Sequence, residues 1–341
     1  MSGRPFLVGT AAVGLAAAGC TGINNQSALD PAGVQAGRIH GLWDLFLAVC
    51  VIVYVLVMAF VIWAVARRRG GSDRPVTAPP ANQDLRTGVI VGGCVVLTVV
   101  VLFGLLIADF LTGRGIDSLA ADADPLVVKV TGHQWWWEVE YQDPVPSHVV
   151  TTANEIHIPV GRTVRVELSS SDVIHSFWVP NLHGKTDMIP GRPTRTFLRA
   201  DREGLYWGQC AEFCGHQHAN MRLQVVARPE AEFQAWLAAQ RRPAPEPTAE
   251  SQKRGQQVFL TRSCVLCHTV AGTTAQSRVG PPLTHVAGRA RIAAGTLPNT
   301  RGHLGGWVSD PQSVKPGVRM PPNPLAPDEL RALLDYLETL K

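Results

Sequence analysis

The stretch Cys210-Ala-Glu-Phe-Cys214-Gly-His-Gln-His218-Ala-Asn-Met221 combines two thiols, an imidazole and a thioether. Soft sulfur ligands together with imidazole select copper, zinc or iron–sulfur chemistry. A structural zinc site would want four Cys or His ligands, and a thioether binds copper well but zinc poorly. A blue-copper site uses a single cysteine, whereas two cysteines with this spacing can bridge two ions. The stretch therefore predicts a dinuclear copper centre.

A dinuclear centre needs a second terminal imidazole from elsewhere in the chain. Two histidines qualify best: His175, in Asp172-Val-Ile-His-Ser-Phe-Trp178, and His183. His175 is favoured because it lies just past a predicted strand, as the upstream histidine of copper-binding sandwiches does. The backbone carbonyl of Glu212 should complete the set. The remaining histidines of this region are expected to be surface or structural residues: His133, His157, His183 and His216.

The region around this cluster, residues 125–228, reads as a β-sandwich. Apolar and polar residues alternate in short segments, and Pro, Gly, Asn and Asp separate them. Many short strands at such spacing are typical of a sandwich. The predicted strands are 126–130, 137–141, 155–158, 163–168, 194–198 and 221–225.

Two apolar segments precede the sandwich, at residues 42–66 and 87–111. Each is long enough to cross ~30 Å of hydrocarbon as a helix. Buried core helices are the alternative, but two such spans in succession are rare in soluble folds. The loop between them is rich in arginine, and positive charge favours the cytoplasmic side. We therefore expect a two-pass hairpin in a bacterial cell membrane, with both chain ends and all later domains outside the cytoplasm.

The segment Phe6 to Gly19 is short, apolar and followed by Cys20. It resembles a bacterial lipoprotein signal, which would make Cys20 the lipidated mature N-terminus. Ala17 stands where such signals usually have a large aliphatic residue, and an uncleaved apolar tail is the alternative. Residues 1–20 are thus assigned to a signal-like segment.

A second cofactor motif, Cys264-Val-Leu-Cys267-His268, is the attachment pattern of c-type haem. The thiols would add to the haem vinyl groups, which places His268 as an axial ligand of the iron. Alone, the pentapeptide also occurs as a thiol redox or metal site in cytosolic proteins. Here it lies in a separate unit, residues 251–341, behind a short helix at 230–240 and a Pro-rich linker at 241–250. We expect this unit to be an all-α cytochrome c domain ending in a helix over 327–340.

The other axial ligand is expected downstream, where Met320 is the only methionine after His268. Met320 lies beside prolines shortly before the last helix, which resembles class I bacterial cytochromes c. Gly280-Pro-Pro-Leu-Thr284 also resembles their loop near the haem. Met/His ligation raises the haem potential, which suits a donor to copper. Ligation by His285 or His303 is the alternative.

Composition supports cofactor chemistry in a membrane protein. The chain has 341 residues, of which 46% are hydrophobic and 17% charged, and the net charge of +4 without a long basic run excludes a nucleic-acid partner. Seven cysteines are present. Cys50 and Cys94 lie in the apolar spans, and the last four form two close pairs beside histidines. A secreted disulfide framework would scatter them instead.

Residues 42–228 resemble the copper-A subunit, subunit II, of cytochrome c oxidase. The resemblance rests on the copper stretch, on Gly132-His-Gln-Trp-Trp-Trp137, on Lys185-Thr-Asp-Met-Ile-Pro-Gly-Arg192 and on Gly204-Leu-Tyr-Trp-Gly-Gln209. With the cytochrome c unit, the whole chain resembles subunit II of caa-type haem-copper oxidases. The fold implied is a transmembrane hairpin, a cupredoxin-like Greek-key sandwich and a cytochrome c domain.

The resemblance also implies residue roles. Cys210 and Cys214 would bridge the two coppers, and His175 and His218 would cap one copper each. Met221 and the Glu212 carbonyl would complete the shells, and the Glu212 carboxylate would reach a magnesium ion shared with the catalytic subunit. Trp135 would lie on the surface where electrons enter.

The implied function is electron input to an oxidase whose partner subunit reduces oxygen to water and translocates protons. Electrons would come from a quinol–cytochrome c reductase or a small cytochrome c, and tethering the haem unit would give it an effective concentration of roughly millimolar. Rival readings are a membrane-anchored electron carrier outside an oxidase and a component of a nitrogen-oxide reductase. Relatives have Glu followed by Trp at the cytoplasmic start of the second span, where the acid helps protons enter. This chain has Arg86 near that place, and Asp84 is the candidate substitute.

Overall fold

The computed structural model of the chain describes residues 26–68, 81–117, 122 and 124–341. Residues 34–123 form one structural unit and residues 124–341 belong to a second. The signal-like segment ending at Cys20 lies outside the described residues.

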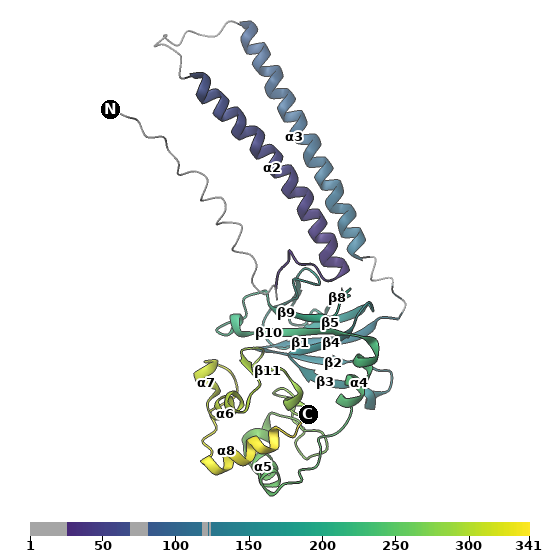
Figure 1. Cartoon of the computed structure of the whole chain (residues 1–341), viewed down its shortest axis with the longest axis vertical. Helices are drawn as coiled ribbons and strands as arrows, with labels where there is room; N and C mark the ends of the chain where they lie inside the picture. The colour runs from purple at the N-terminus through teal and green to yellow at the C-terminus, as the bar shows by residue number, and fades with distance from the viewer. Residues whose placement is uncertain (1–25, 69–80, 118–121, 123) are drawn as a thin grey trace, which may run out of the picture. The chain divides into compact units, whose positions relative to one another are not determined.

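The first unit is a pair of long helices, α2 (Val34–Arg68) and α3 (Ala81–Ile116), which run beside each other (Figure 1). Both are long and apolar enough to cross a membrane. Their Leu, Val, Ile and Phe side chains are largely exposed along the spans. An apolar surface of that size is unfavourable in water and favourable in lipid. The unit therefore fits a membrane anchor, and the helices extend past both predicted spans.

The second unit begins with a β-sandwich of two five-stranded sheets, as predicted. One sheet has the order β3-β2-β1-β5-β8 and the other β4-β10-β9-β6-β7. Pairing is antiparallel except for β1 with β5 and β10 with β4. The strands are β1 (Leu126–His133), β2 (Trp136–Tyr141), β3 (Val150–Ala153), β4 (Glu155–Pro159), β5 (Val164–Ser170), β6 (His175–Trp178), β7 (Thr186–Met188), β8 (Thr194–Leu198), β9 (Gly204–Cys210) and β10 (Arg222–Arg228).

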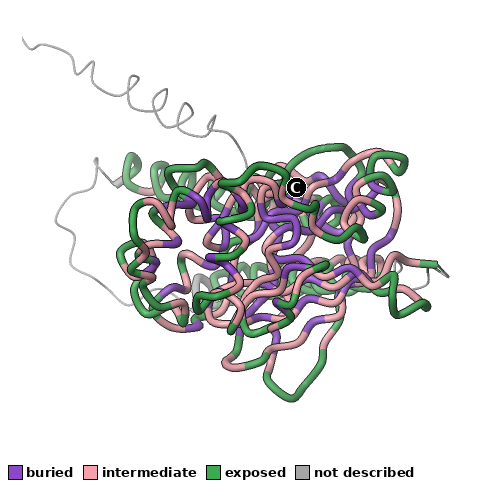
Figure 2. The backbone as a smooth tube through the Cα atoms, turned by 90° about the horizontal axis from the view of Figure 1, so that it is seen from below, coloured by how far each residue is buried: buried purple, intermediate pink, exposed green. Residues whose placement is uncertain are grey.

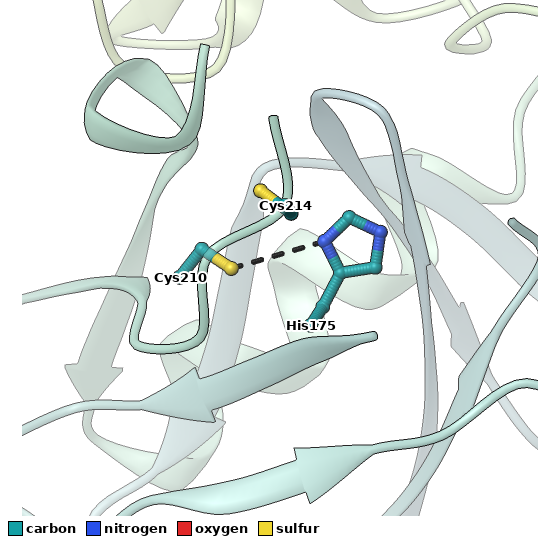
Figure 3. A group of neighbouring side chains, drawn as sticks. All are labelled: His175, Cys210 and Cys214. Atoms are coloured by element: carbon teal, nitrogen blue, oxygen red, sulfur yellow. Dashed lines mark hydrogen bonds between the residues drawn. The ribbon is translucent and has the colours of Figure 1, made fainter. Parts of the chain in front are cut away.

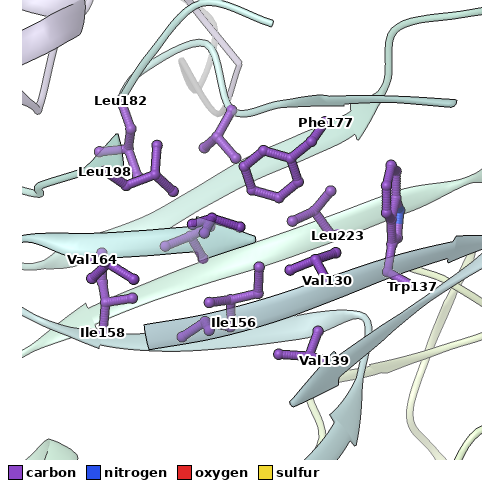
Figure 4. Close-up of a cluster of buried hydrophobic side chains, with 14 of the residues drawn as sticks. Val130, Trp137, Val139, Ile156, Ile158, Val164, Phe177, Leu182, Leu198 and Leu223 are labelled. Atoms are coloured by element: carbon purple, nitrogen blue, oxygen red, sulfur yellow. The ribbon is translucent and has the colours of Figure 1, made fainter. Parts of the chain in front are cut away.

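Alternation along the strands creates the core between the sheets. Buried and less buried positions alternate along β1 and β2, and Figure 2 shows how buried and exposed stretches are distributed along the backbone as a whole. The inward side chains are mostly β-branched or aromatic, and Figure 4 shows Val130, Trp137 and Ile156 among them. Strand β4 is buried throughout because α4 (Glu230–Gln240) packs on its outer side, where Trp236 stacks on His157 at 4.0 Å.

The C-terminal part of the second unit is helical with a minimal β11–β12 pair, Arg291–Ile292 and Leu297–Pro298. Its helices are α5 (Glu250–Thr261), α6 (Arg301–Ser309), α7 (Pro311–Val314) and α8 (Pro327–Leu337). Helices α5 and α8 cross closely at Gly255, where an added Cβ would lie 1.9 Å from the Ala332 carbonyl oxygen. Only glycine permits that approach.

The linker between the two domains packs on the cytochrome domain. The Ala244 N–H donates to the Ala271 carbonyl at 2.9 Å, and Ala244 packs against the cytochrome core. The His285 ring contacts the Gln240 and Arg242 carbonyls, each at 3.1 Å from Nε2. The start of the Pro-rich stretch is therefore held against the cytochrome domain, although most residues of 241–250 are exposed.

Candidate copper and haem sites

The two cysteines of the copper stretch lie at the end of β9 and in the loop that joins β9 to β10. Cys210 is the last residue of β9, and Met221 immediately precedes β10. Both thiols are buried, and their Sγ atoms lie with a His175 ring nitrogen within 4.8 Å of one another. Figure 3 shows the His175 ring directed at the Cys210 sulfur. These three residues are the only such His/Cys/Asp/Glu group within the described ranges.

His175 is the first residue of β6, and its two ring nitrogens have different partners. Nδ1 lies 3.8 Å from the Cys210 sulfur, and Nε2 lies 2.9 Å from Asp172 Oδ1. Asp172 also accepts the Gln134 and Val173 N–H groups. Burial raises the pKa of Asp172, but these hydrogen bonds outweigh it and lower the pKa to about 2. The carboxylate holds the Nε2 proton, so that a neutral His175 ring presents its Nδ1 lone pair as a ligand.

The remaining predicted ligands surround the second cysteine. His218 Nδ1 lies 3.6 Å and Met221 Sδ 3.8 Å from the Cys214 sulfur. The Glu212 carbonyl oxygen lies 3.1 Å from the Cys210 sulfur. All six predicted donor groups are thus brought together.

The alternative imidazole, His183, lies outside this group. Its Nδ1 accepts the Gly184 N–H at 2.6 Å. The metal-ligating group identified near the cysteines holds His175 instead. The geometry favours His175 over His183 as the second imidazole.

The two cysteine thiols interact closely with each other, and the donor set that they belong to fits copper. Hydrogen bonding from the Cys214 thiol holds the pKa of Cys210 well below its usual value, and the same contact raises the pKa of Cys214. Two thiolates, two imidazoles and a thioether are the ligands that copper selects.

Glu212 and Phe213 face outward from the copper loop. The Glu212 side chain is 44% exposed, with Lys185 Nζ at 3.9 Å from its carboxylate. Phe213 is 75% exposed, although it lies between the buried cysteines. A large exposed aromatic side chain beside a half-exposed carboxylate fits a surface that a partner protein covers.

Trp135 is buried rather than exposed at a surface, which corrects the sequence-based expectation. Only 8% of it is exposed, and its indole N–H donates to the Cys214 carbonyl at 2.8 Å. The reason is that residues of the C-terminal domain cover it: Lys315 Nζ bonds its carbonyl, and Gly317 lies near its ring.

The haem motif lines a cavity of about 280 Å³ in the second unit. Cys264, Cys267 and His268 lie on its wall together with Met320. His268 Nδ1 lies 2.7 Å from the Pro281 carbonyl, so Nδ1–H donates there and Nε2 is left as the ligating nitrogen. Apolar side chains form much of the remaining wall, including Phe259, Leu304, Trp307, Val308, Leu333 and Leu337. Two thiols, a neutral imidazole and a thioether around an apolar cavity fit a c-type haem.

The two alternative axial histidines have other partners. His285 Nδ1 lies 2.8 Å from the Lys341 carbonyl and its Nε2 contacts the linker carbonyls. His303 Nδ1 lies 2.7 Å from Thr300 Oγ1 at the start of α6. Neither histidine lines the cavity, whereas Met320 does.

Two functional candidates were missed by sequence reasoning: Asp172 and Arg289. The guanidinium of Arg289 is enclosed at the cavity wall, where burial lowers its pKa to about 10. It donates to the Pro282 carbonyl at 2.6 Å, but its Nε has no partner. A partly buried cation next to an apolar cavity fits a bound group that carries carboxylates. No sequence motif marks either residue, because each acts through a contact formed by folding.

The same cavity also has a wall from the sandwich. His133, Gln134, Trp135 and Trp136 line it opposite the haem motif residues. Trp135 therefore lies between the candidate haem pocket and the backbone of Cys214.

Comparison with known proteins finds a matching family for each of the two domains. Residues 144–228 match the family described as the periplasmic domain of cytochrome c oxidase subunit II, and residues 252–341 match cytochrome c. The chain is 37% identical over 335 residues to cytochrome c oxidase subunit 2 of Alkalihalophilus pseudofirmus, covering 95% of this chain and 93% of the relative. It is 30% identical to that subunit of Bacillus subtilis, with 92% of each chain covered. The crystal structure of the periplasmic domain of cytochrome oxidase subunit II of Bradyrhizobium japonicum is similar at 32% identity and a TM-score of 0.32, covering 33% of this chain and 91% of that one.

Proposed function

Because the chain belongs to the cytochrome c oxidase subunit II family, we propose that it feeds electrons to the oxidase through two centres of its own. The first would be a haem in residues 251–341, and the second a dinuclear copper centre in residues 125–228. The observation that carries this proposal is Trp135, which lines the haem-motif cavity and donates to the Cys214 carbonyl. Membership of an oxidase family weighs against a free-standing electron carrier.

The copper ligands in this proposal are those that the sequence named. Cys210 and Cys214 would bridge the ions, and His175 and His218 would cap them through Nδ1. Met221 and the Glu212 carbonyl would complete the set. Asp172 would fix the tautomer and the orientation of His175, because it holds Nε2–H at 2.9 Å.

The haem would be attached through Cys264 and Cys267 and ligated by His268 and Met320. Arg289 would face its carboxylates. Bound in these sites, haem and copper supply successive one-electron centres between a donor and the catalytic subunit, which reduces oxygen and translocates protons. A quinol–cytochrome c reductase or a small cytochrome c would be the donor.

The protein's own contribution is to fix the distance between the sites. The sandwich presents Trp135 to the cavity, and its indole bonds the backbone of a bridging cysteine. The Glu212 carboxylate would bind magnesium at the contact with the catalytic subunit, beside the exposed Phe213. A buried, hydrogen-bonded set of ligands limits rearrangement when the charge changes.

The hairpin would place these sites outside the cytoplasm. Arginines such as Arg67 and Arg86 flank the loop that joins the two spans, which favours a cytoplasmic loop. Lipidation of Cys20 remains a prediction from the sequence. So does the role of Asp84, which lies in the first turn of α3.

Spectra of the whole chain, extracted from membranes, test the cofactors. We expect low-spin c-type haem in the optical spectrum and the multi-line EPR signal of a mixed-valence copper pair. Zinc, or one copper per chain, at the cysteine pair would refute the copper assignment.

The electron route is tested with Trp135→Phe, which keeps an aromatic ring but removes the N–H bond to Cys214. Its matched control is Trp236→Phe, because Trp236 stacks on His157 at 4.0 Å and neither lines the cavity nor bonds a proposed ligand. Rapid reduction of the haem, followed by optical detection of copper reduction, gives the transfer rate. We expect Trp135→Phe to slow it and Trp236→Phe to leave it near that of the parent protein. Equal rates in both variants would contradict the route.

A further inference from the structure

A short loop of the cytochrome domain lies against the copper domain. This bridging loop, residues 315–320, begins after α7 and ends at Met320, the proposed haem ligand. The Pro316 carbonyl accepts from Gln217 Nε2 at 2.9 Å. A Cβ on Gly317 would lie 3.7 Å from the Trp135 ring, and Val318 packs on the sandwich core.

Lys315 is the most unusual residue of the loop, because its charged side chain is 1% exposed. Its ammonium donates to the Trp135 carbonyl at 3.1 Å, the Asn220 carbonyl at 2.8 Å and the Ala293 carbonyl at 3.2 Å. An ammonium has three donors, so this arrangement uses all of them. Burial lowers the pKa of Lys315 to about 7, which reflects the removal of its charge from water. No carboxylate is among its hydrogen-bond partners.

The three carbonyls belong to both domains. Trp135 and Asn220 are in the sandwich, and Asn220 directly precedes Met221. Ala293 is in the β11–β12 turn of the cytochrome domain. That turn has positive φ angles at Ala293 and Ala294, which direct its carbonyls towards the sandwich. The Ala294 carbonyl accepts the Arg222 N–H at 3.1 Å, so the turn and the bridging loop contact the same edge of the copper site.

The ion pairs between the domains are more exposed, and one further buried charge, that of Glu155, accepts the Ala290 N–H at 2.9 Å. Arg278 donates to Glu138 at 2.9 Å and to Glu140 at 2.6 Å, but its side chain is 60% exposed. Arg319 lies 3.8 Å from Asp172 and is exposed as well. Exposed ion pairs contribute little to stability, whereas leaving buried carbonyls unpaired is costly. Lys315 therefore contributes more to the interface than the exposed ion pairs do, and it bonds two sandwich carbonyls where Glu155 accepts one N–H.

We propose that Lys315 is a positioning residue that locks the cytochrome domain onto the copper domain, so that the fused haem unit is a fixed donor and not a tethered shuttle. Its ammonium holds the backbone of Trp135 and of Asn220, which adjoin the route and the proposed copper ligands. The claim that this contact fixes the haem relative to the copper rests on the proposed function. The claim that Lys315 holds the two domains together does not, and it can be tested separately.

Two backbone amides are bonded across the interface, so their hydrogen exchange measures whether the two domains stay together. The Arg222 N–H is bonded to the Ala294 carbonyl across the interface, and the Ala290 N–H is bonded to Glu155 Oε1 at 2.9 Å. Both N–H groups lose their partner when the domains separate. Hydrogen–deuterium exchange of the intact chain with both cofactors bound therefore measures separation.

The test variant is Lys315→Met, which keeps the length and packing of the stem but removes the three hydrogen bonds. We expect exchange at Arg222 and Ala290 to accelerate roughly ten- to hundredfold, because charge-assisted bonds of this kind are lost. Amides within α8 and within β1 should exchange as in the parent. The control is Lys253→Met, whose side chain is 57% exposed and pairs only with Glu250 in its own helix.

Two results would overturn the proposal. One is unchanged exchange at Arg222 and Ala290 in Lys315→Met. The other is equal acceleration within α8, which would mean that Lys315 stabilises only the cytochrome fold. If Lys315→Met fails to acquire haem, Lys315→Gln is used instead. Glutamine keeps a neutral donor, so the acceleration of amide exchange should be smaller and confined to the interface. Copper and haem spectra of each variant test the proposed function independently.

Discussion

Asp172→Asn tests how the copper site is organised, because Asp172 is not a proposed copper ligand but holds the ring of His175, which is one. The carboxylate accepts three N–H groups: His175 Nε2 at 2.9 Å, Gln134 N at 2.7 Å and Val173 N at 2.8 Å. An asparagine has one acceptor oxygen and one NH₂ group. The least costly orientation keeps the oxygen towards His175 and Val173 and turns the NH₂ group towards the Gln134 N–H. One hydrogen bond is then lost, and the His175 ring donates to a neutral oxygen.

The expected loss of copper affinity is about tenfold, or ~1.4 kcal/mol, at the lower end of what outer-shell partners of metal-binding histidines contribute. Asp172→Ala removes all three acceptors and should approach ~100-fold. Copper affinity is measured by competition with a chelator of known affinity, with the EPR signal reporting the intact pair. The matched control is Glu167→Gln, which removes one negative charge from a half-exposed side chain paired with Arg165. Copper affinity that is equal in Asp172→Ala and Glu167→Gln would refute the orienting role.

Three further changes test other parts of the chain. Cys210→Ser should abolish the copper EPR signal and leave the haem spectrum unchanged, and a persistent mixed-valence signal would contradict the bridging role. Met320→Ala should leave the haem covalently attached but lower its potential in a redox titration, because a thioether ligand raises it. Gly255→Ala should lower the thermal midpoint of the cytochrome domain by overpacking against the Ala332 carbonyl, at about 1–3 kcal/mol. Gly302→Ala, where the space is open, should stabilise the domain slightly; the same shift in both would show that helix propensity alone decides.

The copper ligands from Cys210 to Met221 could be predicted from the sequence because they are local. One loop between adjacent strands carries all of them, so their spacing alone carries the information. The haem motif is local in the same sense. His175 lies far from this loop in the sequence. It was predictable only because copper-binding sandwiches have an upstream histidine ligand, and its ring meets Cys210 only once β6 has paired with β9.

Contacts between distant segments were not predictable. Asp172 acts on a loop at Gln134, and Lys315 bonds Trp135, which is 180 residues away. Neither residue type is unusual at its position in the sequence. The strands β3, β6, β7 and β9 were also missed. Strands β3, β6 and β7 have three or four residues, which are too few to show an alternating pattern, and Gly204 and Gly208 interrupt the pattern in β9.

The long separation between Lys315 and its partners has a consequence for biosynthesis. Arg228 completes the sandwich, but the lysine that closes over it is made roughly 90 residues later, which takes on the order of ten seconds at the usual pace of translation. During that interval the side of the copper domain around Trp135 is uncovered on the growing polypeptide. A metal-delivery factor or a chaperone that needs this side therefore has to act before the cytochrome domain has folded over it.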